Sequence, residues 1–289
     1  MKKIDTSKDL LVGIVIILYR SDCINVDINT LPKNVIVIIV DNTPGQNLNI
    51  KSQNQIKYFS LGKNIGIAGA QNYGINIAYK LGCSHIIFFD QDSIIPKNYI
   101  EEIVDEYERI LLKQPKLFLL GPLIYNGRDG LEYKSKIHTD IKTHYDFIPR
   151  REIISSGSCI AIEKIKDVGV LDNSLFIDFV DFEWCWRANA KGYQSGITPK
   201  ISLTHFVGQQ EYYFLKQLII ISSPTRYFYQ TRNYIWLLKY NYVPTEWKIN
   251  TGIKRILFSL TYPFKVKEWK SIYLNIWKGI IYGLRRKKD

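Results

Sequence analysis

The sequence predicts an α/β fold in which a mostly parallel β-sheet is flanked by helices. Short apolar runs occur at 10–18, 35–40 and 86–89, and their length suits strands that are buried on both faces of a sheet. The stretch 96–112 has apolar residues at helical spacing and separates the third of these runs from another apolar run at 117–120. Strands that alternate with helices in this way are typical of a doubly wound parallel sheet.

Composition and charge divide the chain into two parts. Its 289 residues, 46% of them hydrophobic, are enough to bury a full core. The net charge is +12, and residues 239–289 contain 12 Lys and Arg against 3 Asp and Glu, which leaves +3 for the remainder. We therefore expect a core domain over 1–222 and a helical, basic and aromatic C-terminal segment over 223–289.

The cysteines and the apolar runs indicate a cytoplasmic protein. The four cysteines are separated by tens of residues, and no two have the spacing of a metal or redox pair. No run approaches the ~20 apolar residues needed to cross a bilayer. The basic and apolar start of the chain is not followed by the small residues of a signal-peptide cleavage site, so we do not expect secretion.

Two carboxylates follow the apolar run 86–89. In open α/β sheets, ligands bind beyond the carboxyl ends of the strands, where Asp90 and Asp92 are expected to lie. If the extended conformation continues through Gln91, both side chains point the same way and can hold a divalent cation with its phosphates. The alternative is that the two acids cap a helix that begins near Pro96.

A glycine-rich stretch at 61–74 follows another acid, Asp41, which ends the strand expected at 35–40. The glycine spacing matches neither the dinucleotide fingerprint nor the phosphate-binding loop that ends in Lys and Ser or Thr. Glycines allow a ligand to approach the backbone closely. A tight contact between a helix and a strand explains them equally well.

The block 176–187 places three acids, Asp178, Asp181 and Glu183, among bulky apolar residues. Such surroundings raise the pKa of a carboxyl and cost stability unless the group is paired or used. If a helix begins near Asp181, Asp178 is a candidate N-cap and Glu183 can pair with Arg187. One of the acids then remains for chemistry.

Taken in order, these blocks resemble glycosyltransferase family 2, of the inverting type that uses nucleotide-diphosphosugar donors. The match covers roughly residues 10–240, from Asp41 through the glycine-rich stretch and the Asp90 and Asp92 pair to the acidic block and His205. Within the family the chain looks most like bacterial rhamnosyltransferases that use dTDP-rhamnose. The resemblance implies a GT-A fold over 1–222 and transfer of L-rhamnose to a saccharide acceptor during synthesis of a surface polysaccharide.

The resemblance also implies a role for each matching residue. Asp181 has the position of the catalytic base, while Asp92 and His205 would hold Mg²⁺ or Mn²⁺. The residues implied for nucleotide-sugar binding are Asp41, Asn64, Gly66, Gln71, Asn72 and Asp90. Val180 stands where the family often has a second acid, so Asp178 or Glu183 is expected to orient the acceptor instead. Further candidates for acceptor contacts are Ser156, Gly157, Arg226 and Arg232, although the two arginines are explained slightly better as cover for the core.

The C-terminal segment is expected to contain two helices. The first begins at Ser223 and Pro224 and runs to Tyr240. In the second, apolar residues recur every three or four positions, at Val266, Trp269, Tyr273, Ile276, Ile280 and Leu284. This stripe, followed by four basic residues at 285–288, is typical of a helix in the interface of an anionic membrane. A helix packed on the core domain or on the partner subunit of a homodimer is an equal alternative.

The expected partners are a nucleotide-diphosphosugar and a lipid-linked or oligosaccharide acceptor, with the protein peripheral on the inner face of the cell membrane. Nucleic acid is not expected, because the aromatic residues share one apolar face instead of forming separate stacking platforms. A UDP-dependent galactofuranosyl- or glucosyltransferase is one alternative. A non-catalytic nucleotide-sugar-binding or scaffold protein at the membrane is another. An oxidoreductase is disfavoured, since no glycine-rich turn follows the first strand.

Overall fold

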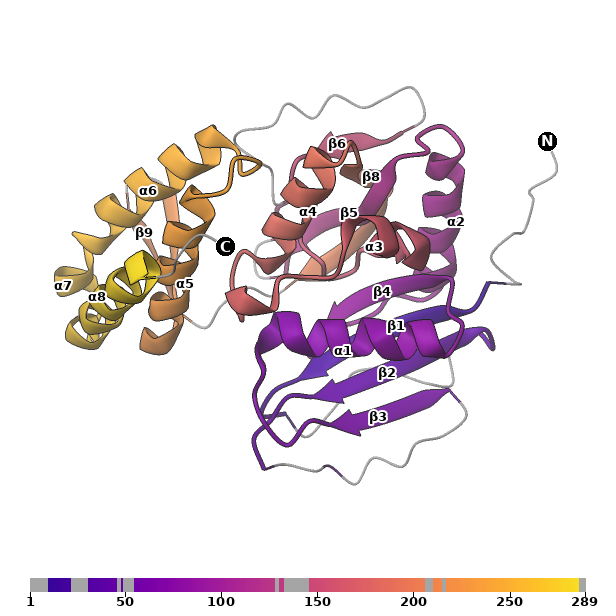
Figure 1. The fold of residues 1–289 in the computed structure, drawn as a ribbon, viewed down its shortest axis with the longest axis horizontal. Coiled ribbons are helices and arrows are strands. Elements are labelled where there is room, and N and C mark those ends of the chain that lie inside the picture. Colours follow the sequence, from indigo (N-terminus) through magenta and orange to yellow (C-terminus); the bar gives the residue numbers. More distant parts are fainter. Residues whose placement is uncertain are drawn as a thin grey trace.

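The computed structural model describes residues 10–21, 31–45, 48, 55–127, 130–132, 146–205, 210–214 and 217–285. Its main sheet has eight strands in the order β3-β2-β1-β4-β7-β5-β8-β6 (Figure 1). The strands are β1 (Val12–Leu18), β2 (Val35–Asp41), β3 (Ile56–Ser60), β4 (His85–Asp90), β5 (Leu117–Asn126), β6 (Ile148–Arg150), β7 (Cys159–Ala161) and β8 (Gln194–His205).

The half of the sheet formed by β3, β2, β1 and β4 is parallel, as the sequence predicts. The chain winds outward from β1 to β3, and α1 (Gly66–Lys80) then returns it to β4 on the other side of β1. The strand order therefore reverses between β1 and β4, which is where ligands bind in open α/β sheets. The other half is mixed, because β7 runs antiparallel to β4 and β5, and β6 runs antiparallel to β8.

Helices lie on both faces of the sheet: α1 covers one face of the parallel half, and α2 (Tyr99–Leu111) packs on the other face beside β5, β7 and β8. Alternate residues of β1 point to opposite faces: Val15 packs in the cluster that includes residues of α1, and Ile14 packs in the cluster that includes residues of α2. On the first face α1 approaches β1 so closely that a Cβ at Gly74 would lie 2.5 Å from Val15. The tight helix–strand contact considered for the glycine-rich stretch thus accounts for Gly74.

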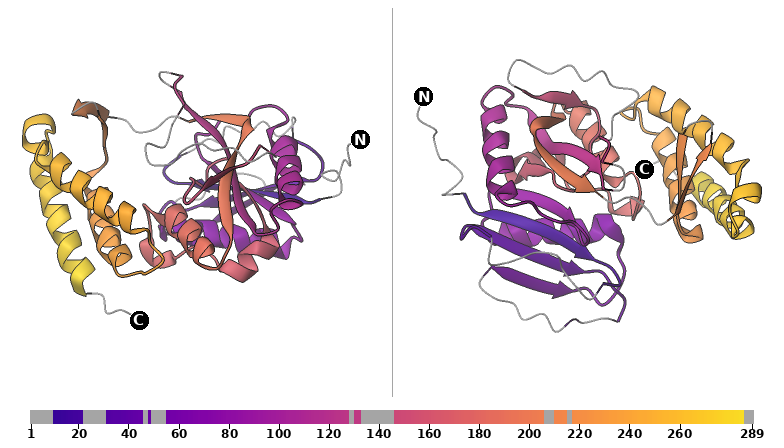
Figure 2. Two further views of the ribbon diagram at one scale, coloured as in Figure 1. Left: turned by 90° about the horizontal axis from the view of Figure 1, so that it is seen from above. Right: turned by 180° about the vertical axis from the view of Figure 1, so that it is seen from behind.

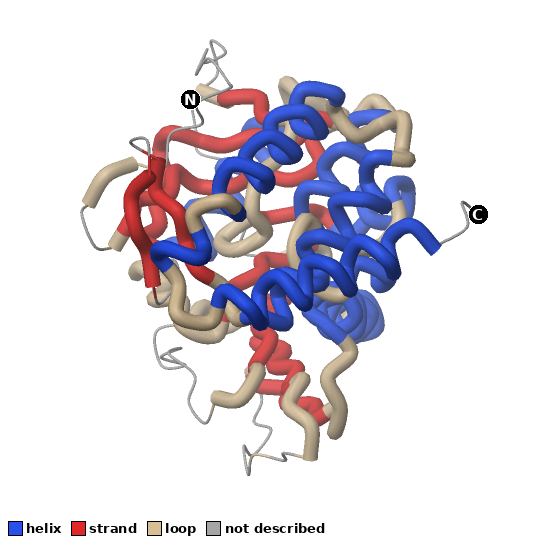
Figure 3. Tube along the Cα trace, turned by 90° about the vertical axis from the view of Figure 1, so that its left-hand side faces the viewer, coloured by secondary structure: helices blue, strands red, loops and turns tan. Residues whose placement is uncertain are grey.

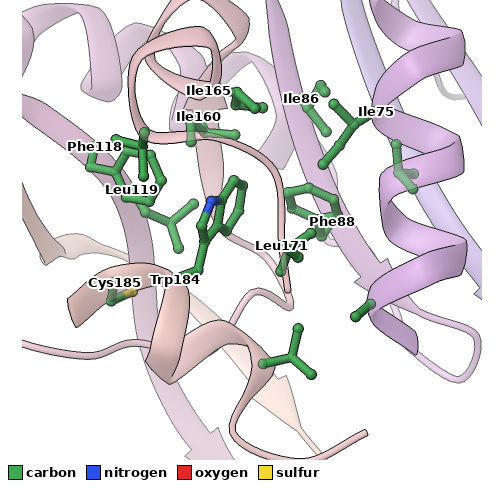
Figure 4. Packing of buried hydrophobic residues seen from close by; sticks show 14 of the residues in the cluster. Ile75, Ile86, Phe88, Phe118, Leu119, Ile160, Ile165, Leu171, Trp184 and Cys185 are labelled. Carbon is green, nitrogen blue, oxygen red and sulfur yellow. The ribbon is translucent and has the colours of Figure 1, made fainter. Parts of the chain in front are cut away.

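Trp184 joins α4 (Val180–Ala190) to the sheet. Its indole is fully buried and makes edge-on contacts with Phe88 of β4 and Phe118 of β5, at centroid distances of 6.2 and 4.9 Å (Figure 4). Its Nε1 donates a hydrogen bond to the carbonyl oxygen of Gly169, 2.7 Å away, just after α3 (Ile162–Val168). Large buried aromatic side chains dominate core energetics, so α4 has a fixed position relative to β4.

The C-terminal segment consists of a hairpin and helices. These elements are β9 (Gln210–Phe214), β10 (Gln217–Ile221), α5 (Pro224–Leu238), α6 (Thr245–Ser259), α7 (Tyr262–Lys265) and α8 (Trp269–Arg285). In α8, Ile272, Gly279 and Gly283 are buried, and the helix packs along α5 (Figure 2). A Cβ at Gly279 would lie 2.7 Å from the carbonyl oxygen of Phe228, so the two backbones approach closely. Within the described ranges, no helix has the length and hydropathy needed to cross a membrane.

Candidate active site

A cavity of about 450 Å³ lies beyond the carboxyl end of β4, bordered by the first turns of α1, α4 and α5. The polar side chains that line it are Gln71, Asp90, Ser155, Asp178, Asp181 and Arg226. The structure thus brings together residues that are as many as 155 positions apart in the chain. Their shared location agrees with a ligand site beyond the carboxyl end of a strand, as the sequence predicts for Asp90.

Asp181 is the second residue of α4 and faces this cavity. Its Oδ2 accepts a hydrogen bond from the backbone N–H of Ser155, and its Oδ1 accepts one from the N–H of Phe182, both 3.2 Å long. Burial raises the pKa of Asp181 from 3.8 to about 6, against the effect of these bonds, and the charge of Asp90 adds to the rise. A carboxylate with this pKa is ionised at neutral pH and can accept a proton from a hydroxyl group.

Asp178 lies in the loop before α4 and pairs with Arg226 of α5. The guanidinium binds both carboxylate oxygens, with Nε at 3.0 and 2.9 Å and Nη2 at 2.7 Å from Oδ1. The prediction that Asp178 caps α4 was wrong, because Phe179 occupies the N-cap position and no side chain caps the helix. The side chain of Arg226 remains 47% exposed and lines the cavity that contains three carboxylates.

The acidic pair after β4 lies in a turn. The strand ends at Asp90, and the N–H of Ser93 donates to the carbonyl oxygen of Asp90 over 3.1 Å, so the extended conformation expected through Gln91 is absent. Asp90 lines the cavity, whereas Asp92 is exposed outside its lining. Within the described part of the chain the Asp92 carboxylate has no hydrogen-bond or ion-pair partner.

The donor set at this turn suits a hard divalent cation, which prefers carboxylate oxygens. His205 is the last residue of β8, where its backbone pairs with Asn126 of β5; its side chain lies outside the described atoms. Among the residues described, no group of three His, Cys, Asp or Glu side chains forms a complete metal site. Asp90 and Asp92 can therefore supply some, but not all, of the oxygen ligands that such an ion needs.

The residues expected to bind the nucleotide lie in different environments. Asp41 is fully buried, and its Oδ1 and Oδ2 accept hydrogen bonds from the N–H of Thr43 (3.0 Å) and the hydroxyl of Tyr58 (2.8 Å). Asn64 accepts a hydrogen bond from the N–H of Gly66 over 2.9 Å. These bonds order the loops at the carboxyl ends of the strands, and nucleotide contacts by the same residues remain a prediction.

Three more residues of this group, Gly66, Gln71 and Asn72, lie in α1. Gln71 lines the cavity and donates to Ser155 Oγ over 3.3 Å. Asn72 instead binds the backbone of Leu171, with its Nδ2 2.8 Å from the carbonyl oxygen and its Oδ1 3.0 Å from the N–H. Gly66 has a φ of 81°, and a Cβ there would lie 2.5 Å from the carbonyl oxygen of Phe176. The close approach of a neighbouring loop therefore explains this glycine.

Ser156 and Gly157 stabilise the connection to β7. The hydroxyl of Tyr99 donates to the carbonyl oxygen of Gly157 over 2.7 Å, and Ser156 Oγ lies 3.4 Å from Ser93 Oγ. Neither residue lines the cavity, but the preceding residue, Ser155, does. Ser155 belongs to the same short stretch of the sequence, but the sequence does not indicate which of its serines faces the cavity.

Glu183 and Arg232 are held by the protein itself. Glu183 is buried and accepts from Arg187 Nε and from the Tyr242 hydroxyl, each at 2.8 Å, which confirms the predicted pair with Arg187. Arg232 is buried and donates to the carbonyl oxygens of Ser174 (2.7 Å) and Leu175 (2.9 Å). Both groups are satisfied in the described structure, and neither lines the cavity.

An α/β sheet with a buried carboxylate of raised pKa in a cavity beyond β4 suits an enzyme that takes a proton from a hydroxyl group, and its similarity to known proteins shows that the chain belongs to glycosyl transferase family 2. The model of that family matches residues 22–161. The dTDP-rhamnosyl transferase RfbF of Shigella flexneri is 33% identical over 242 residues, which cover 79% of this chain and 77% of that protein. The predicted resemblance to this family and to its rhamnosyltransferases is confirmed.

Solved structures with low sequence identity share the fold. The S. aureus TarS 1-349 structure is 12% identical with a TM-score of 0.56, over 96% of this chain and 81% of TarS 1-349. The structure of GalNAc-T7 with UDP, GalNAc and Mn²⁺ is 14% identical with a TM-score of 0.50, over 89% of this chain and 58% of that one. These similarities confirm the predicted GT-A type fold.

Proposed function

We propose that this glycosyltransferase moves L-rhamnose from dTDP-rhamnose to a hydroxyl group of a saccharide acceptor, with inversion, during synthesis of a bacterial surface polysaccharide. The observation that carries the proposal is the position of Asp181, a carboxylate with a pKa of about 6, in the same cavity as Asp90. The similarity to the dTDP-rhamnosyl transferase RfbF supports the donor. The cavity volume of about 450 Å³ is in the usual range for a small-molecule site.

The reaction is a single displacement. The Asp181 carboxylate accepts the proton of the acceptor hydroxyl as its oxygen forms a bond to the anomeric carbon of the sugar. The bond from that carbon to the diphosphate oxygen breaks, and dTDP leaves with its electron pair. Asp90 would hold the donor on the other side of the cavity. Asp178 would orient the acceptor, and Arg226 would neutralise part of the negative charge of the Asp178 carboxylate.

A divalent cation fits the donor side of this cavity. Asp90 and Asp92 would supply carboxylate oxygens, and His205 would supply an imidazole nitrogen, a ligand set that accepts Mn²⁺ or Mg²⁺. Such an ion, when bound, stabilises negative charge on a leaving diphosphate. Removing divalent ions with a chelator should abolish transfer, and Mn²⁺ or Mg²⁺ should restore it; full activity in the chelator would contradict this part of the proposal.

The release of the leaving nucleotide tests the donor and the reaction class together. Purified protein is incubated with dTDP-rhamnose or with UDP-galactofuranose or UDP-glucose, and the nucleoside diphosphate released is measured. We expect dTDP release that depends on acceptor and is lost in Asp181→Asn. Release of UDP alone would favour the UDP-dependent alternative. Thermal stabilisation by dTDP without turnover of any donor would favour a nucleotide-sugar-binding protein.

We also propose that the acceptor is lipid-linked and that the protein binds an anionic membrane surface. The stripe from which the sequence predicted membrane contact is largely internal, since Val266, Trp269, Tyr273 and Ile276 pack with the buried cluster of Tyr227, Tyr262 and Ile272. Leu284 of the stripe is exposed, and the other large apolar residues that remain exposed in this segment lie outside the stripe. On α6 these are Ile249, Ile253, Ile256 and Leu260, each more than half exposed.

These α6 residues recur at intervals of four, three and four positions and so form one outward stripe. Phe264 of α7 is 85% exposed, and Leu274, Trp277 and Leu284 extend the apolar surface on α8. We call this set the α6–α8 surface. Figure 3 looks onto the helical segment from the side opposite the main sheet. Exposed apolar residues that gather on one surface mark interaction sites.

The charge of the segment favours a lipid partner over a second copy of the chain. Residues 239–289 carry 12 basic and 3 acidic side chains, so a two-fold contact would bring like charges together. An anionic bilayer attracts such a segment while it accepts the apolar side chains.

Sedimentation with vesicles tests this surface. The protein should sediment with vesicles that contain phosphatidylglycerol and remain in solution with pure phosphatidylcholine. The double variant Ile253→Glu, Ile256→Glu should lose binding, whereas Leu112→Glu, at a position that is 81% exposed beside α2, should retain it. A dimer in solution that the double variant dissociates, without vesicle binding by the wild type, would contradict the proposal and favour self-association.

A further inference from the structure

The loop 176–179, immediately before α4, has a strained backbone. Phe176, Asp178 and Phe179 have φ values of 65°, 66° and 63°. Non-glycine residues rarely adopt such values, and side chains as large as phenylalanine do so at a cost in free energy. Three of them within four positions persist only if the surrounding structure holds the loop. Because Ile177, Asp178 and Phe179 line the catalytic cavity, the conformation of the loop shapes the site.

Asn233 of α5 holds three carbonyl groups in this part of the chain. Its side chain has no exposed surface, and its Nδ2 donates to the carbonyl oxygens of Leu175 (2.8 Å), Ile177 (2.7 Å) and Asp178 (3.2 Å). Its Oδ1 accepts from the Arg232 guanidinium at 3.0 and 2.8 Å. A buried amide with all of these partners fixes the path of the backbone.

The remaining contacts come from the same face of α5. Arg226 binds the Asp178 carboxylate through three hydrogen bonds, and Tyr229 stacks on Phe176 with ring centroids 4.6 Å apart and planes 9° from parallel. Residues 226, 229 and 233 are separated by three and four positions, the spacing of neighbours on one helix face. On the other side of the loop, the N–H of Ala68 in α1 reaches the carbonyl oxygen of Phe176 at 3.4 Å.

We propose that Asn233 is a positioning residue of the transfer reaction, which acts by holding loop 176–179 and thereby the placement of Asp181 and the acceptor side of the cavity. The inference rests on the proposed function in one respect, the role of Asp181 as the catalytic base. It makes α5 part of the catalytic apparatus, although α5 belongs to the C-terminal segment. The helices behind the α6–α8 surface are thus connected to the active site, because α8 packs along the helix that holds this loop.

Asn233→Leu tests the proposal, because leucine has the same number and branching of side-chain heavy atoms but cannot bind the three carbonyls. We expect kcat to fall at least ~10-fold with the donor KM changed by less than ~3-fold, since the donor side of the cavity is formed by other elements. Water that enters around a loosened loop should also lower the pKa of Asp181 from about 6, so the acid limb of the rate profile should move to lower pH. Asn275→Leu is the control, because Asn275 donates to Ser271 within α8 and is far in sequence from the loop.

A purely structural role for Asn233 would lower the melting temperature and leave kcat per folded molecule and the acid limb unchanged, and that result would overturn the proposal. Should Asn233→Leu fold poorly, Tyr229→Leu removes the ring stacked on Phe176 and is expected to change kcat in the same direction by a smaller factor. Amide hydrogen exchange separates this proposal from the proposed function. Faster exchange at 174–180 in Asn233→Leu is expected whether or not dTDP-rhamnose is the donor, and unchanged exchange there would contradict the inference.

Discussion

Replacing Asp181 by asparagine should remove activity and increase stability. The loss of the base is expected to lower kcat by about 10²- to 10⁴-fold. The gain in stability follows from the raised pKa of Asp181, because a carboxyl whose pKa rises on folding is ionised at a cost in the native state. The protonated carboxyl therefore stabilises the folded state relative to the unfolded one. The wild type loses this stabilisation as the pH rises from about 4 to about 6.

The size of the gain follows from the structure. A pKa raised from 3.8 to about 6 corresponds to about 3 kcal/mol for the ionised group. Asparagine offers one acceptor oxygen where the carboxylate offers two, so the N–H of Ser155 or of Phe182 loses its partner, at about 1 kcal/mol. We therefore expect Asp181→Asn to unfold with a free energy about 2 kcal/mol higher than that of the wild type at pH 8, and with almost no gain at pH 4.

Urea unfolding at pH 4 and pH 8, together with nucleotide release at pH 8, measures both effects. Asp92→Asn is the control for stability, since the Asp92 carboxylate is exposed and has no partner in the described structure; it should leave the unfolding free energy unchanged at both pH values. A variant that is inactive and equally or less stable at pH 8 would refute the argument that burial raises the pKa of Asp181. A variant that retains wild-type turnover would refute its role as base.

Three further substitutions test the framework around the cavity. Trp184→Ala removes the indole between β4 and α4 and should lower the free energy of unfolding by about 3–5 kcal/mol in urea titrations; a loss below about 1 kcal/mol would contradict the anchoring role. Arg187→Ala leaves the buried Glu183 carboxylate without its cation and should cost about 3–5 kcal/mol at pH 7 in the same titrations; an unchanged stability would contradict the importance of this ion pair. Arg226→Lys keeps the charge but not the bidentate geometry, so steady-state kinetics should show a higher acceptor KM with the donor KM unchanged; the opposite pattern would place Arg226 on the donor side.

The strands of the parallel half could be predicted because their burial on both faces leaves a simple signal in the sequence. The runs at 35–40 and 86–89 agree closely with β2 and β4. The mixed half was not predicted, since β6 and β7 have three residues each and are too short to show a period. Their pairing is decided by long-range contacts with β4, β5 and β8.

The candidate site was predicted where residue type and local order carry the information. Asp90 follows from the strand end, and the pair of Glu183 with Arg187 follows from helical spacing. The acidic block left one of three acids for chemistry, and the resemblance to the family pointed to Asp181. Asn233 could not be found in this way, because an asparagine within a helix has no special local signal, and its partners lie 55 to 58 positions earlier. For the stripe of the last helix the sequence left membrane contact and packing on the protein as equal alternatives, and the structure shows that four of its residues pack on a buried cluster. Spacing identifies an apolar face but not what covers it.

A crystal structure with dTDP and Mn²⁺ would test most directly whether the cavity beyond β4 is the active site. We expect an anomalous manganese peak within bonding distance of Asp90 and Asp92, a diphosphate beside it, and an open space between that diphosphate and Asp181 large enough for one sugar. Nucleotide bound elsewhere would contradict this expectation, for example in the hollow of about 440 Å³ between α1 and α3 that Tyr79 and Ile162 help to line.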